Sequence, residues 1–211
     1  MTSDKTEQAK KITILDRVLL LITGLLAAYQ VGFGINNLGL IPEISYSIAF
    51  GVLLVAGLLI IIMGFQILDS PMVVVISTII PLSLSLGLVA QFFKSWFIPY
   101  AIFVVLSFLV ILGTRFVGEK TIKVISIIVG HTIAGMIIFL TPLVLSFSGK
   151  TPSLFAFVGL GGALIGVGGT LLSFLKMGKP ILSKNTILTI LPGLLMIMMI
   201  CFIIGFLALS G

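Results

Sequence analysis

Seven long apolar runs separated by short polar turns constrain this chain more than any other feature of its sequence. Each run is close to the roughly 20 residues that a helix needs to cross a bilayer. The predicted spans lie at about 13–34, 44–67, 72–92, 96–114, 124–146, 153–175 and 186–209. Of the 211 residues, 59% are hydrophobic and 9% are charged, which leaves too little polar surface for a water-soluble globule. The sequence therefore predicts an all-α, polytopic membrane protein of about seven transmembrane helices, with a single transmembrane domain over 1–211.

The Lys and Arg residues predict how these spans are oriented, because cationic residues are retained on the cytoplasmic side during insertion. A cytoplasmic N-terminus leaves only Lys94 and Lys150, of the 12 Lys and Arg residues, outside. The cytoplasmic set is then Lys5, Lys10, Lys11, Arg17, Arg115, Lys120, Lys123, Lys176, Lys179 and Lys184. Near the predicted outer boundary lie four aromatic residues whose rings suit a membrane interface, namely Tyr29, Tyr46, Trp96 and Tyr100. We therefore expect a multi-pass protein of the cell (cytoplasmic) membrane, with its N-terminus in the cytoplasm and its C-terminus outside.

The net charge of +6 is spread in ones and twos beside the apolar runs. This pattern favours contact with anionic lipid headgroups on the cytoplasmic side of the bilayer and argues against nucleic acid. A homo-oligomer or a membrane protein partner is compatible with the same surface. The one cysteine, Cys201, lies inside an apolar run, so a disulfide within the chain is excluded. No metal site and no cofactor are predicted.

Two parts of the chain align at a nearly constant offset. Pro81 and Pro192 are 111 positions apart, and each follows a threonine by three residues, Thr78 and Thr189. The same offset, within two positions, relates Gly24 to Gly135, Pro42 to Pro152 and Pro71 to Pro180. It predicts two parallel three-helix repeats, at 12–92 and 121–209, joined by a linker helix at 96–114. The alternative is a chance match between helices rich in Ile, Leu and Val.

This 3+1+3 plan resembles, in its layout, that of the SWEET-type sugar transporters. The proline-glutamine dipeptide associated with that wider group is absent from this sequence. The resemblance is therefore one of architecture, and it implies no membership of the family.

Polar side chains inside the spans are the first candidates for a binding site, because an unpaired polar group in hydrocarbon is costly. Every Lys, Arg, Asp and Glu can be placed at a predicted membrane boundary, which leaves His131 and Gln30 as main candidates. An imidazole titrates near neutral pH, which suits a proton-linked gate or a ligand contact at His131. The alternative is a neutral histidine that hydrogen-bonds to a neighbouring helix.

Pro81 and Pro192 are predicted to interrupt the third and seventh spans, because each removes one backbone donor and frees the carbonyl four residues earlier. Matched breaks of this kind point to a substrate site in a transporter built from repeats. Thr78 and Thr189 belong to the same candidate site. The alternative is that the prolines only kink their helices and that these two threonines satisfy the freed carbonyls.

The span at 153–175 is rich in glycine. Gly162 and Gly166 have the small-residue spacing that lets two transmembrane helices approach closely. We expect both residues to serve helix packing.

The residue inventory excludes several enzyme classes. One histidine and no carboxylate buried in the membrane cannot supply the metal cluster of an intramembrane metalloprotease or the paired aspartates of an aspartyl protease. A non-enzymatic protein is expected, and two functions remain. A small transporter or channel with a midplane site at the proline-broken spans predicts a water-accessible cavity between the repeats. A non-catalytic accessory or scaffold subunit of a larger membrane complex predicts a tightly packed bundle without such a cavity.

Overall fold

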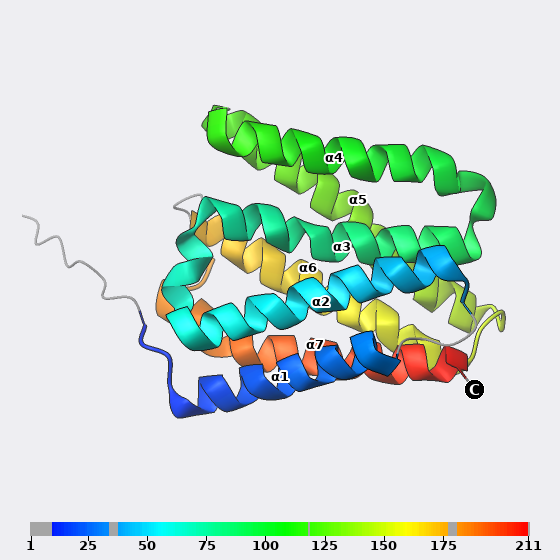
Figure 1. Cartoon of the computed structure of the whole chain (residues 1–211), viewed down its shortest axis with the longest axis horizontal. Helices are drawn as coiled ribbons and strands as arrows, with labels where there is room; N and C mark the ends of the chain where they lie inside the picture. The colour runs from blue at the N-terminus through cyan, green and yellow to red at the C-terminus, as the bar shows by residue number, and fades with distance from the viewer. Residues whose placement is uncertain (1–9, 34–37, 118, 177–180, 211) are drawn as a thin grey trace, which may run out of the picture.

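Seven long helices run back and forth through the protein in the computed structural model shown in Figure 1. The structure describes residues 10–33, 38–117, 119–176 and 181–210. The long helices are α1 (Ile14–Phe33), α2 (Leu40–Met63), α3 (Pro71–Phe92), α4 (Phe97–Val117), α5 (Lys120–Phe147), α6 (Ala156–Lys176) and α7 (Lys184–Ser210). Short 3-10 helices, η1 (Phe65–Asp69), η2 (Lys94–Trp96) and η3 (Ser153–Phe155), lead into α3, α4 and α6.

The described part of the chain holds seven helices that are long and apolar enough to cross a membrane, and it contains no β-strand. The prediction of an all-α, seven-helix, multi-pass membrane protein is confirmed. The largest boundary error concerns α2, which begins at Leu40 and ends at Met63 instead of spanning 44–67. Pro42 is tolerated in the first turn, where its missing N–H is not needed. Gly64 ends the helix because its φ of 76° is a conformation that favours glycine.

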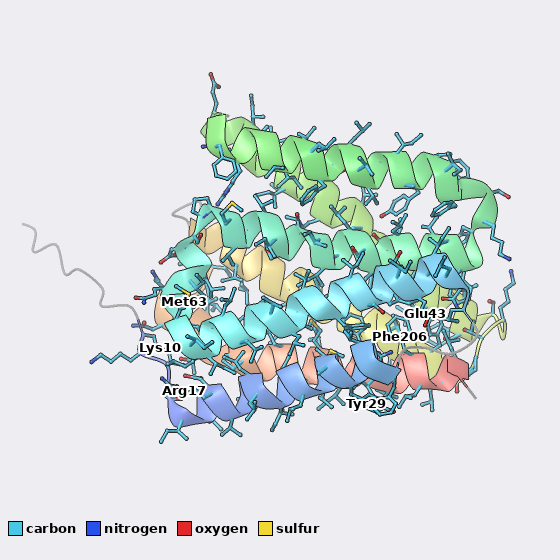
Figure 2. The ribbon with its side chains drawn as sticks, viewed as in Figure 1. Lys10, Arg17, Tyr29, Glu43, Met63 and Phe206 are labelled. Carbon is cyan, nitrogen blue, oxygen red and sulfur yellow. The ribbon has the colours of Figure 1, made fainter. Side chains whose placement is uncertain are left out.

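Most of the cationic residues gather at one end of the bundle, on the left in Figure 1. We call it the basic end and define it by Lys10, Arg17, Arg115, Lys123 and Lys184. Figure 2 shows Lys10, Arg17 and Met63 at this end, with Tyr29, Glu43 and Phe206 toward the other. The other end, called the opposite end, carries Lys94 and Lys150. Lys5 and Lys179 lie outside the described residues. Which end faces the cytoplasm stays a prediction.

The helices contact one another in a pattern that is nearly symmetric. In the first half α1 packs on α2 and α2 on α3, and in the second half α5 packs on α6 and α6 on α7. The halves meet where α1 packs on α7 and where α5 packs on α3. Exchanging α1, α2 and α3 for α5, α6 and α7 leaves this list of neighbours unchanged. Helix α4 lies at the edge of the bundle against α3 and α5 (Figure 1). This pattern is compatible with the 3+1+3 plan, and the duplication itself stays a prediction.

Aromatic rings fill the centre of the bundle toward the opposite end. This aromatic cluster consists of Tyr46, Phe50, Phe155, Phe202 and Phe206, all of them at most 2% exposed. The ring centroids of Tyr46 and Phe206 are 4.7 Å apart, and those of Phe50 and Phe202 are 5.8 Å apart. Because these rings come from α2, η3 and α7, they join the first half of the chain to the second.

Candidate functional site

A groove between α5 and α6 is the hollow that holds the largest number of the residues singled out from the sequence. It has a volume of about 670 Å³, and Pro81 of α3 lies in its wall. We call it the α5–α6 groove. Its lining includes Ile127, His131, Gly135, Gly162, Ala163, Gly166 and Phe174. The groove is built from both predicted repeats, since α3 belongs to the first and α5 and α6 belong to the second.

The groove exists because α5 and α6 touch toward the opposite end and separate toward the basic end. A Cβ added to Gly159 would lie 2.7 Å from the carbonyl oxygen of Phe139, and one added to Gly162 would lie 2.6 Å from Cγ2 of Ile138. Closer to the basic end, Gly135 and Gly166 have no such neighbour within 4 Å. Contact at one end and open space at the other give the groove its shape.

The walls of the groove are almost entirely apolar. Its polar side chains are His131, Thr132 and Thr170, and His131 is half-buried. The imidazole interacts with the backbone of Ile127, one turn earlier in its own helix. Its Cδ2 atom lies 3.9 Å from where a Cβ on Gly169 would be. Among the described residues no hydrogen bond joins His131 to a neighbouring helix, so the imidazole contributes a polar group to an otherwise apolar groove.

Of the remaining predicted site residues, Thr78 lies closest in sequence to Pro81, which lines the groove. It is fully buried on α3, one turn before Pro81, and its hydroxyl donates to the carbonyl of Val75 at 2.7 Å. Gln30 lies in α1, outside the lining of the groove, and is 3% exposed. Its Oε1 atom is buried without a hydrogen-bond partner among the described residues. The structure therefore does not bring Gln30 to His131.

Pro192 and Thr189 of α7 also lie apart from the groove. Pro192 is buried, whereas Thr189 is exposed and donates to the carbonyl of Asn185 at 2.7 Å. Helices α3 and α7 both continue through their prolines, so the expected interruptions are wrong. Each proline removes one hydrogen bond, as expected. Neither Thr78 nor Thr189 donates to the carbonyl that its proline frees, which is a second correction.

Lys10 reaches the carbonyl freed by Pro192. Its Nζ atom lies 3.0 Å from Oδ2 of Asp16 and 3.5 Å from the carbonyl oxygen of Leu188. The same ammonium lies over the ring of Phe65, 5.2 Å from its centroid, within the range of a cation–π contact. We call this arrangement the Lys10 clasp. It ties the start of α1 to α7 at the basic end of the bundle.

Asp16 is held in place by its own helix start. The backbone N–H of Thr13 donates to Asp16 Oδ2 at 2.9 Å, and the N–H of Asp16 donates to Thr13 Oγ1 at 3.1 Å. These reciprocal bonds form a capping box. Asp16 is only 4% exposed, so protein atoms cover this carboxylate although it lies in the first turn of α1, at the predicted membrane boundary. The capping pattern is visible in the sequence, but its ammonium partner and the Leu188 carbonyl are not.

Two further predictions need correction. Gly166 has open space beside it and lines the groove, whereas Gly162 lies against Ile138 as helix packing requires. Tyr46 is not an interfacial ring, since it is 2% exposed in the aromatic cluster and its hydroxyl donates to Gln91 at 2.9 Å. A Cβ on Gly87 would lie 2.5 Å from this ring, so the absence of a side chain there makes room for Tyr46.

A second hollow, not found from the sequence, lies between α3, α4 and α5 toward the opposite end. Its volume is about 510 Å³, and its lining includes Trp96, Tyr100, Met136 and Thr141. The Tyr100 hydroxyl donates to Ser85 Oγ at 2.8 Å and so joins α4 to α3. Met136 lines both hollows, which places them on two flanks of α5.

No group of three or more His, Cys, Asp or Glu side chains that could hold a metal ion occurs among the described residues. Comparison of the chain with protein-family models, with curated proteins and with solved structures gives no match. Its function is therefore inferred from the side chains of the grooves and helices themselves.

Proposed function

We propose that the chain is a small, non-enzymatic membrane transporter that binds its substrate in the α5–α6 groove. The observation that supports this proposal is the composition of the groove. It combines Pro81 from the first predicted repeat with His131 and Gly166 from the second, around a volume of about 670 Å³. Sites at the junction of two repeats are typical of transporters built in this way.

The chemistry of the groove indicates which molecules it suits. Apolar walls bind apolar surface, and a few polar groups set the orientation of a ligand. A strongly hydrated sugar or ion would lose its water against such walls without gaining equivalent hydrogen bonds. The proposed substrate is therefore mainly apolar, with a polar part, and it enters from the lipid.

Transport requires a second state in which the site opens toward the other end. In the present arrangement the contacts at Gly159 and Gly162 close the groove toward the opposite end, and the aromatic cluster fills the centre of the bundle there. A transport cycle would need the rings of this cluster to separate. The packing around Ala49, which is fully buried beside them, would then become accessible.

Single cysteines in a Cys201→Ser background test this proposal. Ala163→Cys reports on the groove, and Ala49→Cys reports on the aromatic cluster. Both are small substitutions. In sealed vesicles, a membrane-impermeant thiol reagent should modify Ala163→Cys from the basic end and Ala49→Cys slowly from the opposite end. Full protection of Ala49→Cys from both sides, while the groove cysteine reacts, would contradict transport.

The same aromatic cluster supports a second candidate function. Its rings pack directly against one another between α2 and α7, as expected of a packed accessory or scaffold subunit. For that function the Ala49→Cys thiol stays protected under all conditions, and the groove serves as a contact for lipid or for a partner helix. The accessibility experiment therefore separates the two candidates.

We also propose that the basic end faces the cytoplasm. Eight of the Lys and Arg residues whose backbone is described belong to this end, namely Lys10, Lys11, Arg17, Arg115, Lys120, Lys123, Lys176 and Lys184. Retention of cations on the cytoplasmic side supports this orientation. A protease-sensitive tag at the N-terminus should be cleaved only from the cytoplasmic side and one at the C-terminus only from the other side, and cleavage of the N-terminal tag from outside would contradict this orientation.

A further inference from the structure

The α5–α6 groove opens sideways as well as toward the basic end. Ile128, Met136 and Val167 line it and are 48%, 49% and 50% exposed. In a chain that crosses the bilayer, apolar side chains with this exposure face lipid. A molecule already dissolved in the membrane can therefore reach the groove without passing through water.

The length of the groove matches one lipid leaflet. From Ile127 to Phe139 its lining extends along α5 for about 18 Å, at 1.5 Å per residue. One leaflet contributes about 15 Å to the hydrocarbon core of a bilayer. An acyl chain that lies along α5 would therefore extend from the basic end to the point where Gly162 meets Ile138 and the groove closes.

A lysine stands at the end of the groove where a lipid headgroup would lie. Lys123 precedes Ile127 by one helical turn and so shares its face of α5. Two other lysines at the basic end form ion pairs, Lys10 with Asp16 at 3.0 Å and Lys184 with Asp69 at 3.6 Å. Lys123 has no ion pair with a described carboxylate. His131 lies about 12 Å deeper along the helix, below the level of a headgroup.

We infer that the α5–α6 groove binds an anionic phospholipid from the leaflet at the basic end, with its phosphate at Lys123 and an acyl chain along Pro81, Gly135 and Gly166. This inference rests on the proposed function, because it names the substrate class of the same groove. The positive charge at the mouth and the apolar walls behind it complement the two parts of such a lipid. One lysine at an anionic lipid surface strengthens binding about fivefold.

Quenching of tryptophan by brominated lipids tests the inference on the full chain. Trp96→Phe removes the one native tryptophan, and Phe174→Trp places a reporter in the lining of the groove. The vesicles consist of phosphatidylcholine with either brominated phosphatidylglycerol or brominated phosphatidylcholine. We expect the anionic lipid to be preferred about fivefold at this reporter. Lys123→Gln should abolish the preference, and Gly166→Leu, which fills the open space, should reduce quenching by either lipid.

Phe116→Trp is the matched control. Phe116 is a lipid-facing phenylalanine, 56% exposed, and it is next to Arg115 at the basic end but outside the groove. Quenching at this reporter should not respond to Gly166→Leu or to Lys123→Gln. An unchanged preference at Phe174→Trp in both variants would overturn the inference.

The outcomes also separate the inference from the proposed function. If Gly166→Leu reduces quenching but the two brominated lipids quench equally, the anionic assignment is wrong and the groove remains a substrate site. If the headgroup preference behaves as expected but Ala49→Cys stays protected, the lipid assignment stands and transport is wrong.

Discussion

The two sides of the bundle differ at the basic end in what occupies the space beside the proline inside a helix. This proline is Pro192 of α7 on one side and Pro81 of α3 on the other. On the α1–α7 side, Lys10, Phe65 and Leu20 fill this space, and Leu20 is fully buried. On the α5–α3 side, the corresponding space is the α5–α6 groove. The sequence offset of 111 positions relates the two sides. It aligns Asp16 with Ile127, Leu20 with His131 and Gly24 with Gly135.

Glycines on the two sides differ in the same way, since Gly24 and Gly57 have close neighbours and Gly135 and Gly166 do not. A Cβ on Gly24 would meet Leu54 at 3.4 Å, and one on Gly57 would lie 3.8 Å from the carbonyl oxygen of Leu20. Gly135 and Gly166 have open space instead. One arrangement of helices can therefore give either a closed interface or a binding groove. A few side chains decide which of the two forms.

The largest expected effect is the loss of the Lys10 clasp. Asp16→Ala leaves the Lys10 ammonium, whose side chain is 17% exposed, without its carboxylate and removes a capping bond from α1. Breaking a pair buried to this extent should lower the free energy of unfolding by about 3 kcal/mol. Unfolding in mixed detergent micelles measures this change. Lys184→Gln is the control, because its pair with Asp69 is more exposed and should contribute at most about 0.5 kcal/mol. Equal losses in the two variants would contradict a special role for the clasp.

A smaller effect is expected where α5 and α6 touch. Gly162→Ala forces a methyl group to within 2.6 Å of Ile138 Cγ2 and 3.1 Å of its backbone carbon. Such overpacking should destabilise the protein by about 2 kcal/mol and should separate the two helices. Thermal unfolding in micelles gives the loss of stability. A neutral substitution would mean that α5 and α6 are not in close contact at this point.

Gly166→Ala should have the opposite sign, although it lies one turn away in the same helix. Its new methyl group meets no atom within 4 Å, and alanine favours a helix over glycine by about 0.5–1 kcal/mol. We expect a gain in stability of that order in the same unfolding measurement. A loss as large as that of Gly162→Ala would show that the groove is closed in the folded protein.

The smallest predicted effect is a coupling between Lys10 and Pro192. Pro192→Ala restores an N–H donor for the carbonyl of Leu188, so Lys10→Met should then cost about 0.5 kcal/mol less than in the native background. The double-mutant cycle with Pro81→Ala in place of Pro192→Ala is the control and should show no coupling. Equal coupling energies in the two cycles would mean that Lys10 does not recognise the freed carbonyl.

Much of the fold was predictable from the sequence because the length and polarity of each span are local properties. The seven apolar runs, the turn at Pro71 and the cations at the helix ends can all be read without knowledge of tertiary contacts. The end of α2 was misplaced because Phe65 and Ile67 continue the apolar run, although Gly64 has already ended the helix. Hydropathy alone does not register that change of backbone conformation.

The site was less predictable because its defining contacts join residues far apart in the chain. A helical glycine looks the same in the sequence whether it faces a neighbouring backbone, as Gly162 does, or open space, as Gly166 does. The crossing of α5 and α6 decides between the two. The bond from Lys10 to Leu188 spans 178 positions, and the capping pattern of Thr13 and Asp16 reveals only its local half.

An open groove between α5 and α6 can be tested by comparing one cysteine on each side of the bundle. Gly135→Cys and Gly24→Cys, each in a Cys201→Ser background, lie at corresponding positions of α5 and α1. The rate of modification by a small maleimide should be much higher for Gly135→Cys, because the groove admits the reagent, whereas Leu54 and the neighbouring side chains cover Gly24. Equal rates would contradict the presence of an open binding groove between α5 and α6.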